Sequence, residues 1–254
     1  MPPEAQAGLR LIYEIEPPRE PSLDKFCRQL ELYGGVVDAV LIPDNHLGRP
    51  ALSSVALAIE AHRHGVHPIV ALNARDRNLL RLRSDLLTLH AFGIDDVLFL
   101  FGDHIAEGRT GLTVRRMLAD EAPAGMRRGA VVPMDRALGW RSAADYLFAQ
   151  LGTEGLASAH RIRAEGWTKP IYAGTAALAS RVLAERLVGA IPGFVLPEGY
   201  LAAFDADEEA GFAAAIGWLD DLQAAGITGA HLVVPARRAR FAELLGAWRS
   251  GNRD

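Results

Sequence analysis

The stretch "HPIVALNARDRNLLRLRSDLLTLHAFGIDDVLFLFGD", residues 67–103, decides the fold that the sequence predicts. A short apolar run lies near each end of the stretch, and each run is about as long as a buried strand. Between the two runs, apolar residues recur with helical spacing, and Gly93 then separates the helical part from the second run. The stretch therefore predicts a strand–helix–strand unit in which the two strands are parallel.

The same alternation runs along the whole chain. Apolar runs predict eight strands, at 9–15, 38–43, 67–72, 96–101, 129–133, 169–173, 190–196 and 230–234. Helical periodicity marks segments at 21–35, 78–93, 142–151, 175–189 and 207–226. Segment 153–168 either extends the helix at 142–151 or contains another strand. Eight such units in 254 residues predict an α/β protein with one domain, a (βα)8 TIM barrel over residues 1–254.

Composition limits the partners that we expect. A net charge of -4 and a pI near 6.1 give no electrostatic case for binding nucleic acid or an anionic membrane. No run of about 18 apolar residues occurs, and the single cysteine, Cys27, excludes an internal disulfide. We therefore expect a soluble, cytoplasmic protein. Histidines 62, 64 and 67 fall at a predicted helix-to-strand turn, where we expect solvated side chains and no metal site.

Polar residues follow several predicted strands, at the end where barrel enzymes carry their active sites. They are Glu14, Glu16, Asp44, Asn45, Asn73, Asp103, His104, Asp135 and Arg136. Because Glu14 and Glu16 are two residues apart, an extended segment turns both to one face, whereas Leu11, Tyr13 and Ile15 face the helices. Crowded carboxylates favour protonation of one of them, as a general acid requires. We therefore expect Glu14 to have a role in the active site, and Glu16 to be either a second site residue or a hydrogen-bond partner behind it.

The ordered motifs resemble those of one enzyme family. "YEIEPPRE" (13–20), "DAVLIPDNHLGRPALSSVALA" (38–58) and residues 68–103 are similar to segments of the methylenetetrahydrofolate reductases, which are (βα)8 barrels. The likeness is best from about residue 10 to 103, continues more weakly through 129–145, and returns at "IPGFVLP" (191–197). The resemblance implies reduction of 5,10-methylenetetrahydrofolate to 5-methyltetrahydrofolate, with hydride passing from NAD(P)H through FAD.

The resemblance also implies roles for individual residues. Glu14 matches the glutamate thought to protonate the N10 nitrogen of the folate, and Asp103 matches an aspartate near the flavin that binds the pterin. Both are therefore predicted to be catalytic, and together with Glu16 to bind the tetrahydrofolate derivative. Cofactor-binding residues on the matching segments are Asp44, Asn45, Asn73, Asp103 and Asp145.

Several positions depart from the family pattern, mostly around the flavin. A His-Leu-Thr segment of the family is Ala71-Leu72-Asn73 here, and polar or basic positions after Asp145 are Phe148, Leu151 and Gly152. The tyrosine expected after the fifth strand is Val132, and the following family positions are Met134 and Arg136. Because the FAD pyrophosphate depends on charge-assisted hydrogen bonds, these changes weaken its expected site.

Two alternatives follow from these departures. In the first, hydride passes directly from NADH to the folate without flavin. In the second, the barrel is not catalytic and serves as a subunit or folate-binding partner of another enzyme, in a homo- or hetero-oligomer.

Overall fold

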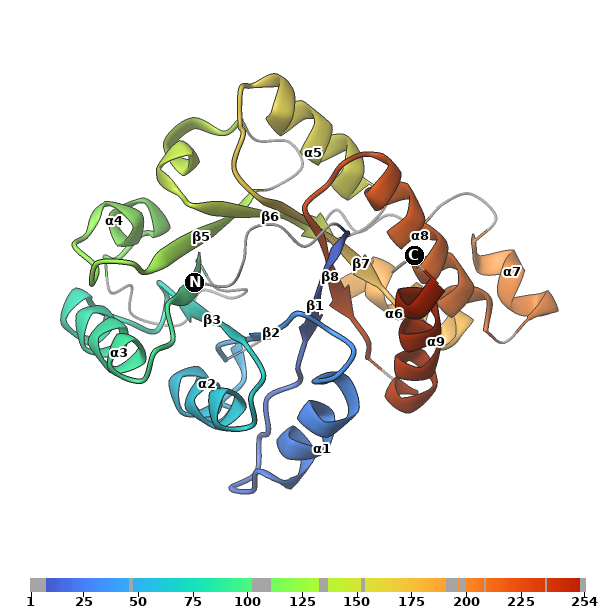
Figure 1. Ribbon diagram of the computed structural model, residues 1–254, viewed down its shortest axis with the longest axis horizontal. Helices are drawn as coiled ribbons and strands as arrows, with labels where there is room; N and C mark the ends of the chain where they lie inside the picture. Colours follow the sequence, from blue (N-terminus) through green and yellow to red (C-terminus); the bar gives the residue numbers. More distant parts are fainter. Residues whose placement is uncertain are drawn as a thin grey trace.

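A computed structural model shows eight parallel strands closed into a barrel with helices around it, which confirms the predicted (βα)8 fold (Figure 1). The structure describes residues 8–45, 48–101, 111–132, 137–151, 154–190, 196, 200–207, 209–235 and 237–251. Within these ranges, every helix lacks the length and hydropathy that crossing a bilayer requires.

The strands follow one another around the barrel in chain order. They are β1 (Arg10–Glu14), β2 (Ala39–Ile42), β3 (Pro68–Asn73), β4 (Asp96–Leu100), β5 (Arg127–Val132), β6 (Tyr146–Leu151), β7 (Ile171–Ala176) and β8 (Gly229–Val233). Each strand pairs with the next, and β8 pairs in parallel with β1 to close the ring.

The helices cover the outside of this ring. They are α1 (Asp24–Tyr33), α2 (Ser54–Arg63), α3 (Leu79–Ala91), α4 (Val114–Ala119), α5 (Glu154–Ala164), α6 (Arg181–Ala190), α7 (Tyr200–Ala206), α8 (Ala210–Ala224) and α9 (Arg238–Gly251), with a short 3-10 helix η2 (Gly139–Ala143) before β6. The side chain of Asn78 caps α3 by accepting a hydrogen bond from the Arg81 N–H, 2.8 Å away.

One of the predicted elements was wrong. Segment 142–151 was expected to be a helix, but its second half is strand β6, and 154–164 is helix α5. In β6, Tyr146 and Phe148 point into the barrel, whereas Leu147 and Ala149 pack against the outer helices. Because both faces of this strand are buried, its apolar run carries no alternation that separates it from a helix.

The strand predicted at 190–196 falls mostly outside the described residues. Ala190 is the last residue of helix α6, Leu196 belongs to no strand, and residues 191–195 lie outside the described part of the chain. The barrel closes without this segment, because β7 pairs directly with β8. The predicted total of eight strands is right, although β6 was missed.

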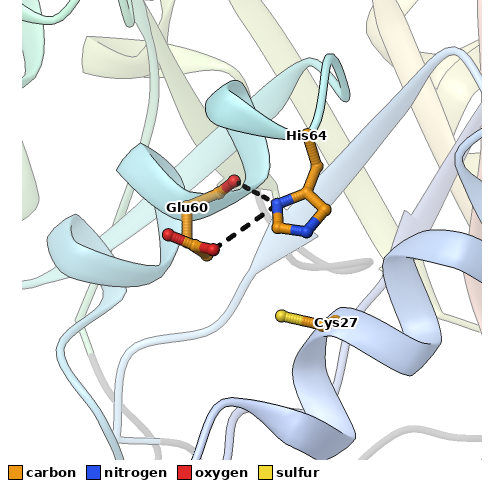
Figure 2. A group of neighbouring side chains, drawn as sticks. All are labelled: Cys27, Glu60 and His64. Carbon is orange, nitrogen blue, oxygen red and sulfur yellow. Dashed lines mark hydrogen bonds and ion pairs between the residues drawn. The ribbon is translucent and has the colours of Figure 1, made fainter.

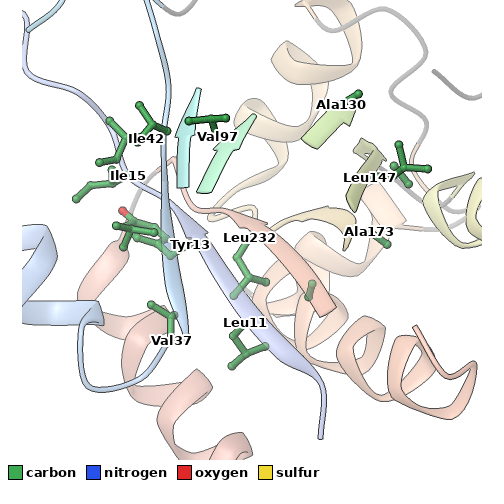
Figure 3. Packing of buried hydrophobic residues seen from close by; sticks show 14 of the residues in the cluster. Leu11, Tyr13, Ile15, Val37, Ile42, Val97, Ala130, Leu147, Ala173 and Leu232 are labelled. Atoms are coloured by element: carbon green, nitrogen blue, oxygen red, sulfur yellow. The ribbon is translucent and has the colours of Figure 1, made fainter. Parts of the chain in front are cut away.

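Each barrel strand has two buried faces. Outward side chains, including Leu11, Tyr13, Ile15 and Leu232, pack against the helices in the main core (Figure 3). A second cluster fills the inside of the barrel and consists of Ile12, Ala39, Leu41, Ile69, Ala71, Leu98, Tyr146, Phe148 and Tyr172. The barrel is thus packed through its centre, and space for a ligand has to lie above this filling, at the carboxyl ends of the strands.

Polar groups complete the amino-terminal end of the barrel. Arg127 Nε donates to Asp96 Oδ1 at 2.6 Å, and His67 Nε2 lies 2.6 Å from Asp96 Oδ2. Burial opposes ionisation of Asp96, but the hydrogen bonds from His67 and Arg127 hold the pKa of this carboxyl below its usual value. Arg10 Nη1 donates to the Tyr172 hydroxyl at 3.2 Å. His67 therefore supports the amino-terminal end of the barrel, opposite the carboxyl ends of the strands.

We predict that Gly129→Ala destabilises the barrel. A methyl group at Gly129 would lie only 2.1 Å from the ring of Tyr146, which is fully enclosed. Overpacking of this kind typically costs about 1–3 kcal/mol in the free energy of unfolding, measurable by urea denaturation. Gly35→Ala is the matched control, since a methyl group there meets no atom within 4 Å. Equal stability of the two variants would contradict the tight packing of Tyr146.

Candidate active site

Glu14 and His231 lie within hydrogen-bond distance of each other at the carboxyl end of the barrel. Glu14 is the last residue of β1 and lies on the same strand face as Ile12, which packs inside the barrel. His231, on the neighbouring strand β8, places its Nε2 atom 2.9 Å from Glu14 Oε2. The side chain of Glu14 is only 20% exposed and that of His231 only 12%. At this distance one hydrogen bond joins a carboxyl group and an imidazole, and the proton in such a bond can move between them.

Aromatic rings lie directly below this pair. The ring of Phe148 meets the His231 ring edge-on, with centroids 5.2 Å apart, and lies 5.1 Å from the Tyr172 ring. Phe148 and Tyr172 are almost entirely buried. The pair therefore stands on an apolar floor, where electrostatic interactions are stronger than in water.

His231 was not among the residues predicted for the site. The sequence places it in the apolar run 230–234, and no motif marks it. His231 could have been found from the alternation of side chains along a strand. Ala230 and Leu232 pack outward against the helices, so a histidine between them has to point into the barrel. That it meets Glu14 depends on the pairing of the first strand with the last.

Glu16 is separated from Glu14. The expectation of a shared face assumed that the strand continues to Glu16, but β1 ends at Glu14. The Glu16 carboxylate is 60% exposed and accepts a hydrogen bond from Arg238 Nη2 at 2.6 Å. Gln29 fixes the backbone here, since its amide accepts from the Glu16 N–H at 3.1 Å and donates to the Glu16 carbonyl. An arginine, rather than Glu14, is therefore the partner of this carboxylate.

A cavity of about 640 Å3 lies beside this loop on the outside of the barrel. It is lined by Glu16, Pro17, Pro18, Arg19, Glu20, Ser22, Asp24, Lys25, Arg28, Gln29, Leu32 and Arg238. Glu14 is not part of the lining. The two glutamates therefore face different surroundings.

The predicted residues Asp44, Asn45 and Asn73 do come together, at the ends of β2 and β3. The Asn73 N–H donates to Asp44 Oδ2 at 2.9 Å, and the Asn73 side-chain amide also donates to this carboxylate. The amide of Asn45 donates to Asp76 Oδ2 at 3.1 Å. The loops after the two strands are thereby tied to each other.

Two arginines neutralise the carboxylates of this network. Arg77 donates to Asp44 and, at 2.9 Å, to Asp85 Oδ2. Burial disfavours the charged guanidinium, but these two carboxylates raise the pKa of Arg77 above its usual value. Arg75 donates two hydrogen bonds to the Asp76 carboxylate, from Nε to Oδ1 and from Nη2 to Oδ2, each at 2.5 Å. These hydrogen bonds lower the pKa of Asp76 to about 2. Charges here are paired within the protein, as a buried network requires.

Asp145 does not lie at this mouth. It was expected on a fifth helix near the cofactor, but it directly precedes β6 and so lies at the amino-terminal end of the barrel. Its carboxylate accepts a hydrogen bond from the Arg128 N–H at 2.8 Å. The error follows from reading β6 as a helix, which would have carried this side chain to the opposite end.

The remaining predicted positions lie outside the described residues. They are Asp103, His104, Met134, Asp135 and Arg136.

The described residues do not fit the FAD site that the sequence resemblance implies. Asp145 is at the wrong end of the barrel, and Phe148 fills the interior instead of facing a pyrophosphate. Arg75 and Arg77, near the ends of β2 and β3, are held by aspartates. A dinucleotide phosphate would have to displace those carboxylates to gain the same charge-assisted bonds.

No protein-family model matches the chain, and no curated protein matches it in sequence. Among solved structures, the chain is similar to an uncharacterized protein from Clostridium thermocellum that binds two copies of 5-methyl-5,6,7,8-tetrahydrofolic acid. The likeness has a TM-score of 0.66 and covers 97% of this chain and 95% of the other, at 13% sequence identity. The two proteins share a fold. At this identity the likeness describes architecture and assigns no ligand to this chain.

We predict that Asp76→Asn weakens the fold at neutral pH by about 1 kcal/mol, because it removes a partly exposed, charge-assisted pairing with Arg75. The pKa of Asp76 falls from 3.8 to about 2 on folding. The stabilisation is therefore fully present above pH 4 and is lost as the pH falls towards 2.

Urea unfolding at pH 7, 5, 4 and 3 measures this effect. The difference between wild type and Asp76→Asn should narrow below pH 4. Asp221→Asn, on an exposed position of α8, is the control and should show no such trend. A constant difference at all four pH values would contradict the assignment to the ionised Asp76 carboxylate.

Proposed function

We propose that the protein binds a tetrahydrofolate derivative at the carboxyl end of the barrel and acts as a methylenetetrahydrofolate reductase-like enzyme. The observation that carries the proposal is the Glu14–His231 pair, a proton-sharing group on an apolar floor at that end of the barrel. Glu14 is also the residue that the sequence resemblance matches to the proton donor of that family. Geometry and resemblance thus select the same carboxylate independently.

The chemistry of the substrate explains why such a pair is useful. The five-membered ring of 5,10-methylenetetrahydrofolate opens when the N10 nitrogen is protonated, which breaks its bond to the bridging carbon and leaves an iminium at N5. Glu14, as the acid, delivers this proton, and His231, whose Nε2 atom lies 2.9 Å from the Glu14 carboxyl group, returns a proton to it. The carboxylate left on Glu14 then favours the cationic iminium beside it. Hydride addition to the methylene carbon completes the reduction to a 5-methyl group.

NAD(P)H is the proposed hydride source. Direct transfer from the nicotinamide agrees with the poor fit of the described residues to FAD, and no step above involves a flavin. Asp103 remains our proposed partner for the pterin or the iminium, and Glu16 a proposed contact for the folate, both on the resemblance.

The structural neighbour supports the ligand class. A barrel with the same fold binds 5-methyltetrahydrofolic acid, which is the product of the reaction proposed here. Sharing a fold does not fix a function, so ligand binding by this chain has to be measured directly.

Binding measurements with one ligand at a time test the ligand class. We expect 5-methyltetrahydrofolate to bind in calorimetric titration, and we expect the purified protein to be colourless and to show no saturable binding of FAD. A yellow protein with flavin absorbance would restore FAD as the hydride carrier and contradict direct transfer. Failure to bind any tetrahydrofolate would reject the folate proposal altogether.

Substitution of the pair tests the mechanism. Glu14→Gln removes the acid while keeping the shape of the side chain, so kcat for NADH-dependent reduction should fall about a hundredfold or more. His231→Gln should lower kcat less, because Glu14 can still take a proton from water. Glu243→Gln, at an exposed position of α9, is the matched control, and its kcat should equal that of the wild type.

Folate binding should survive in both variants of the pair. Wild-type protein that binds folate without any turnover would favour the alternative of a non-catalytic folate-binding subunit. Full activity in Glu14→Gln would instead assign the proton transfer to another group.

A further inference from the structure

Three side chains of types that can bind metals come together from two neighbouring helices on the outside of the barrel. Cys27 lies on α1, Glu60 on α2, and His64 is the residue that follows the last turn of α2. Their potential ligand atoms all lie within 4.8 Å of one another. Figure 2 shows the three side chains converging on the space between the two helices. The group is separate from the Glu14–His231 pair, which lies inside the barrel mouth.

Local structure prepares the histidine for such a role. Glu60 and His64 are four residues apart, so they lie on the same face of the helix. His64 Nδ1 is 3.0 Å from the Glu60 backbone carbonyl and 3.6 Å from Glu60 Oε1. A hydrogen bond from Nδ1–H to a backbone carbonyl leaves the lone pair on Nε2, which is the usual arrangement in a metal-bound histidine.

The combination of donors selects the ion. A thiolate, an imidazole and a carboxylate match Zn2+, which binds such groups at about 2.0–2.3 Å in tetrahedral geometry. Ligand atoms of a tetrahedral zinc site are then roughly 3.5 Å apart. Side-chain movements of about 1 Å would bring the potential ligand atoms, which lie within 4.8 Å of one another, to that spacing. Mg2+ and Ca2+ prefer oxygen ligands throughout and are disfavoured by the sulfur.

We propose that Cys27, Glu60 and His64 bind one Zn2+ ion, with a water molecule as the fourth ligand. Cys27 and Glu60 are partly buried and His64 is exposed, so the ion reaches the site from solvent without unfolding. The bound ion links α1 to α2 and stabilises the folded state in proportion to its occupancy.

The charge around Cys27 agrees with a cation. Three carboxylates, those of Glu60, Glu31 and Asp24, lie close enough to Cys27 to act on it electrostatically. The same three carboxylates attract a divalent ion, which on binding displaces the proton from sulfur.

Cobalt titration of the intact chain tests the proposal. Co2+ bound to a thiolate gives a charge-transfer absorption in the near ultraviolet, and because Cys27 is the single cysteine, this band can report on Cys27 alone. We expect a band that saturates at one Co2+ per chain under reducing conditions and disappears when Zn2+ is added. The melting temperature should rise with Zn2+ in wild type and stay constant in Cys27→Ser.

The Co2+ affinities of single variants distinguish a site with three protein ligands from binding by the Cys27 thiol alone. Glu60→Gln and His64→Gln should each weaken Co2+ binding at least tenfold, whereas His62→Gln, at an exposed position of the same helix, should leave it unchanged. Absence of the band in folded wild-type protein overturns the proposal. Equal Co2+ affinity in wild type, Glu60→Gln and His64→Gln overturns it as well, since the thiol would then act alone. None of these readouts depends on folate or on NAD(P)H.

Discussion

Pairing of the first strand with the last is the constraint on which the rest of the structure depends. Residues Arg10–Glu14 align in parallel with Gly229–Val233, more than two hundred positions later in the chain. This register leaves no free sheet edge and turns alternate side chains into a packed interior. It also brings a glutamate and a histidine from opposite ends of the chain within 2.9 Å of each other. The proposed proton donor thus exists only when the barrel is closed.

Polar groups at the barrel ends serve different purposes. At the amino-terminal end, Asp96 is bound by His67 and Arg127, and at the ends of β2 and β3 the carboxylates of Asp44 and Asp76 are bound by arginines. In each of these cases the charge is balanced by neighbouring protein groups, which fits a structural role. The Glu14–His231 pair differs in its surroundings, because it lies on the apolar floor inside the barrel mouth, and both of its groups can donate or accept a proton. That difference is the physical reason for placing the proposed proton transfer at Glu14 and His231.

The sequence predicted the barrel because its strand and helix segments alternate, and it predicted a special position for Glu14 because acids are unusual in apolar strands. It failed at β6, where Tyr146, Leu147, Phe148 and Ala149 are all buried and the apolar run has no strand-like alternation. The placement of Asp145 failed with it. Local patterns also predicted that Asp44, Asn45 and Asn73 lie near one another, since parallel strands end at the same edge.

The sequence by itself determined the class of fold and the inward direction of Glu14, because these follow from short-range periodicity. Only the tertiary structure decided the partners: His231 for Glu14, Arg238 for Glu16, and His64 with Glu60 for Cys27. The contacts of Glu14 with His231 and of Glu16 with Arg238 each join residues more than two hundred positions apart in the chain. Such contacts depend on strand register and helix packing, which no local pattern in a single chain specifies.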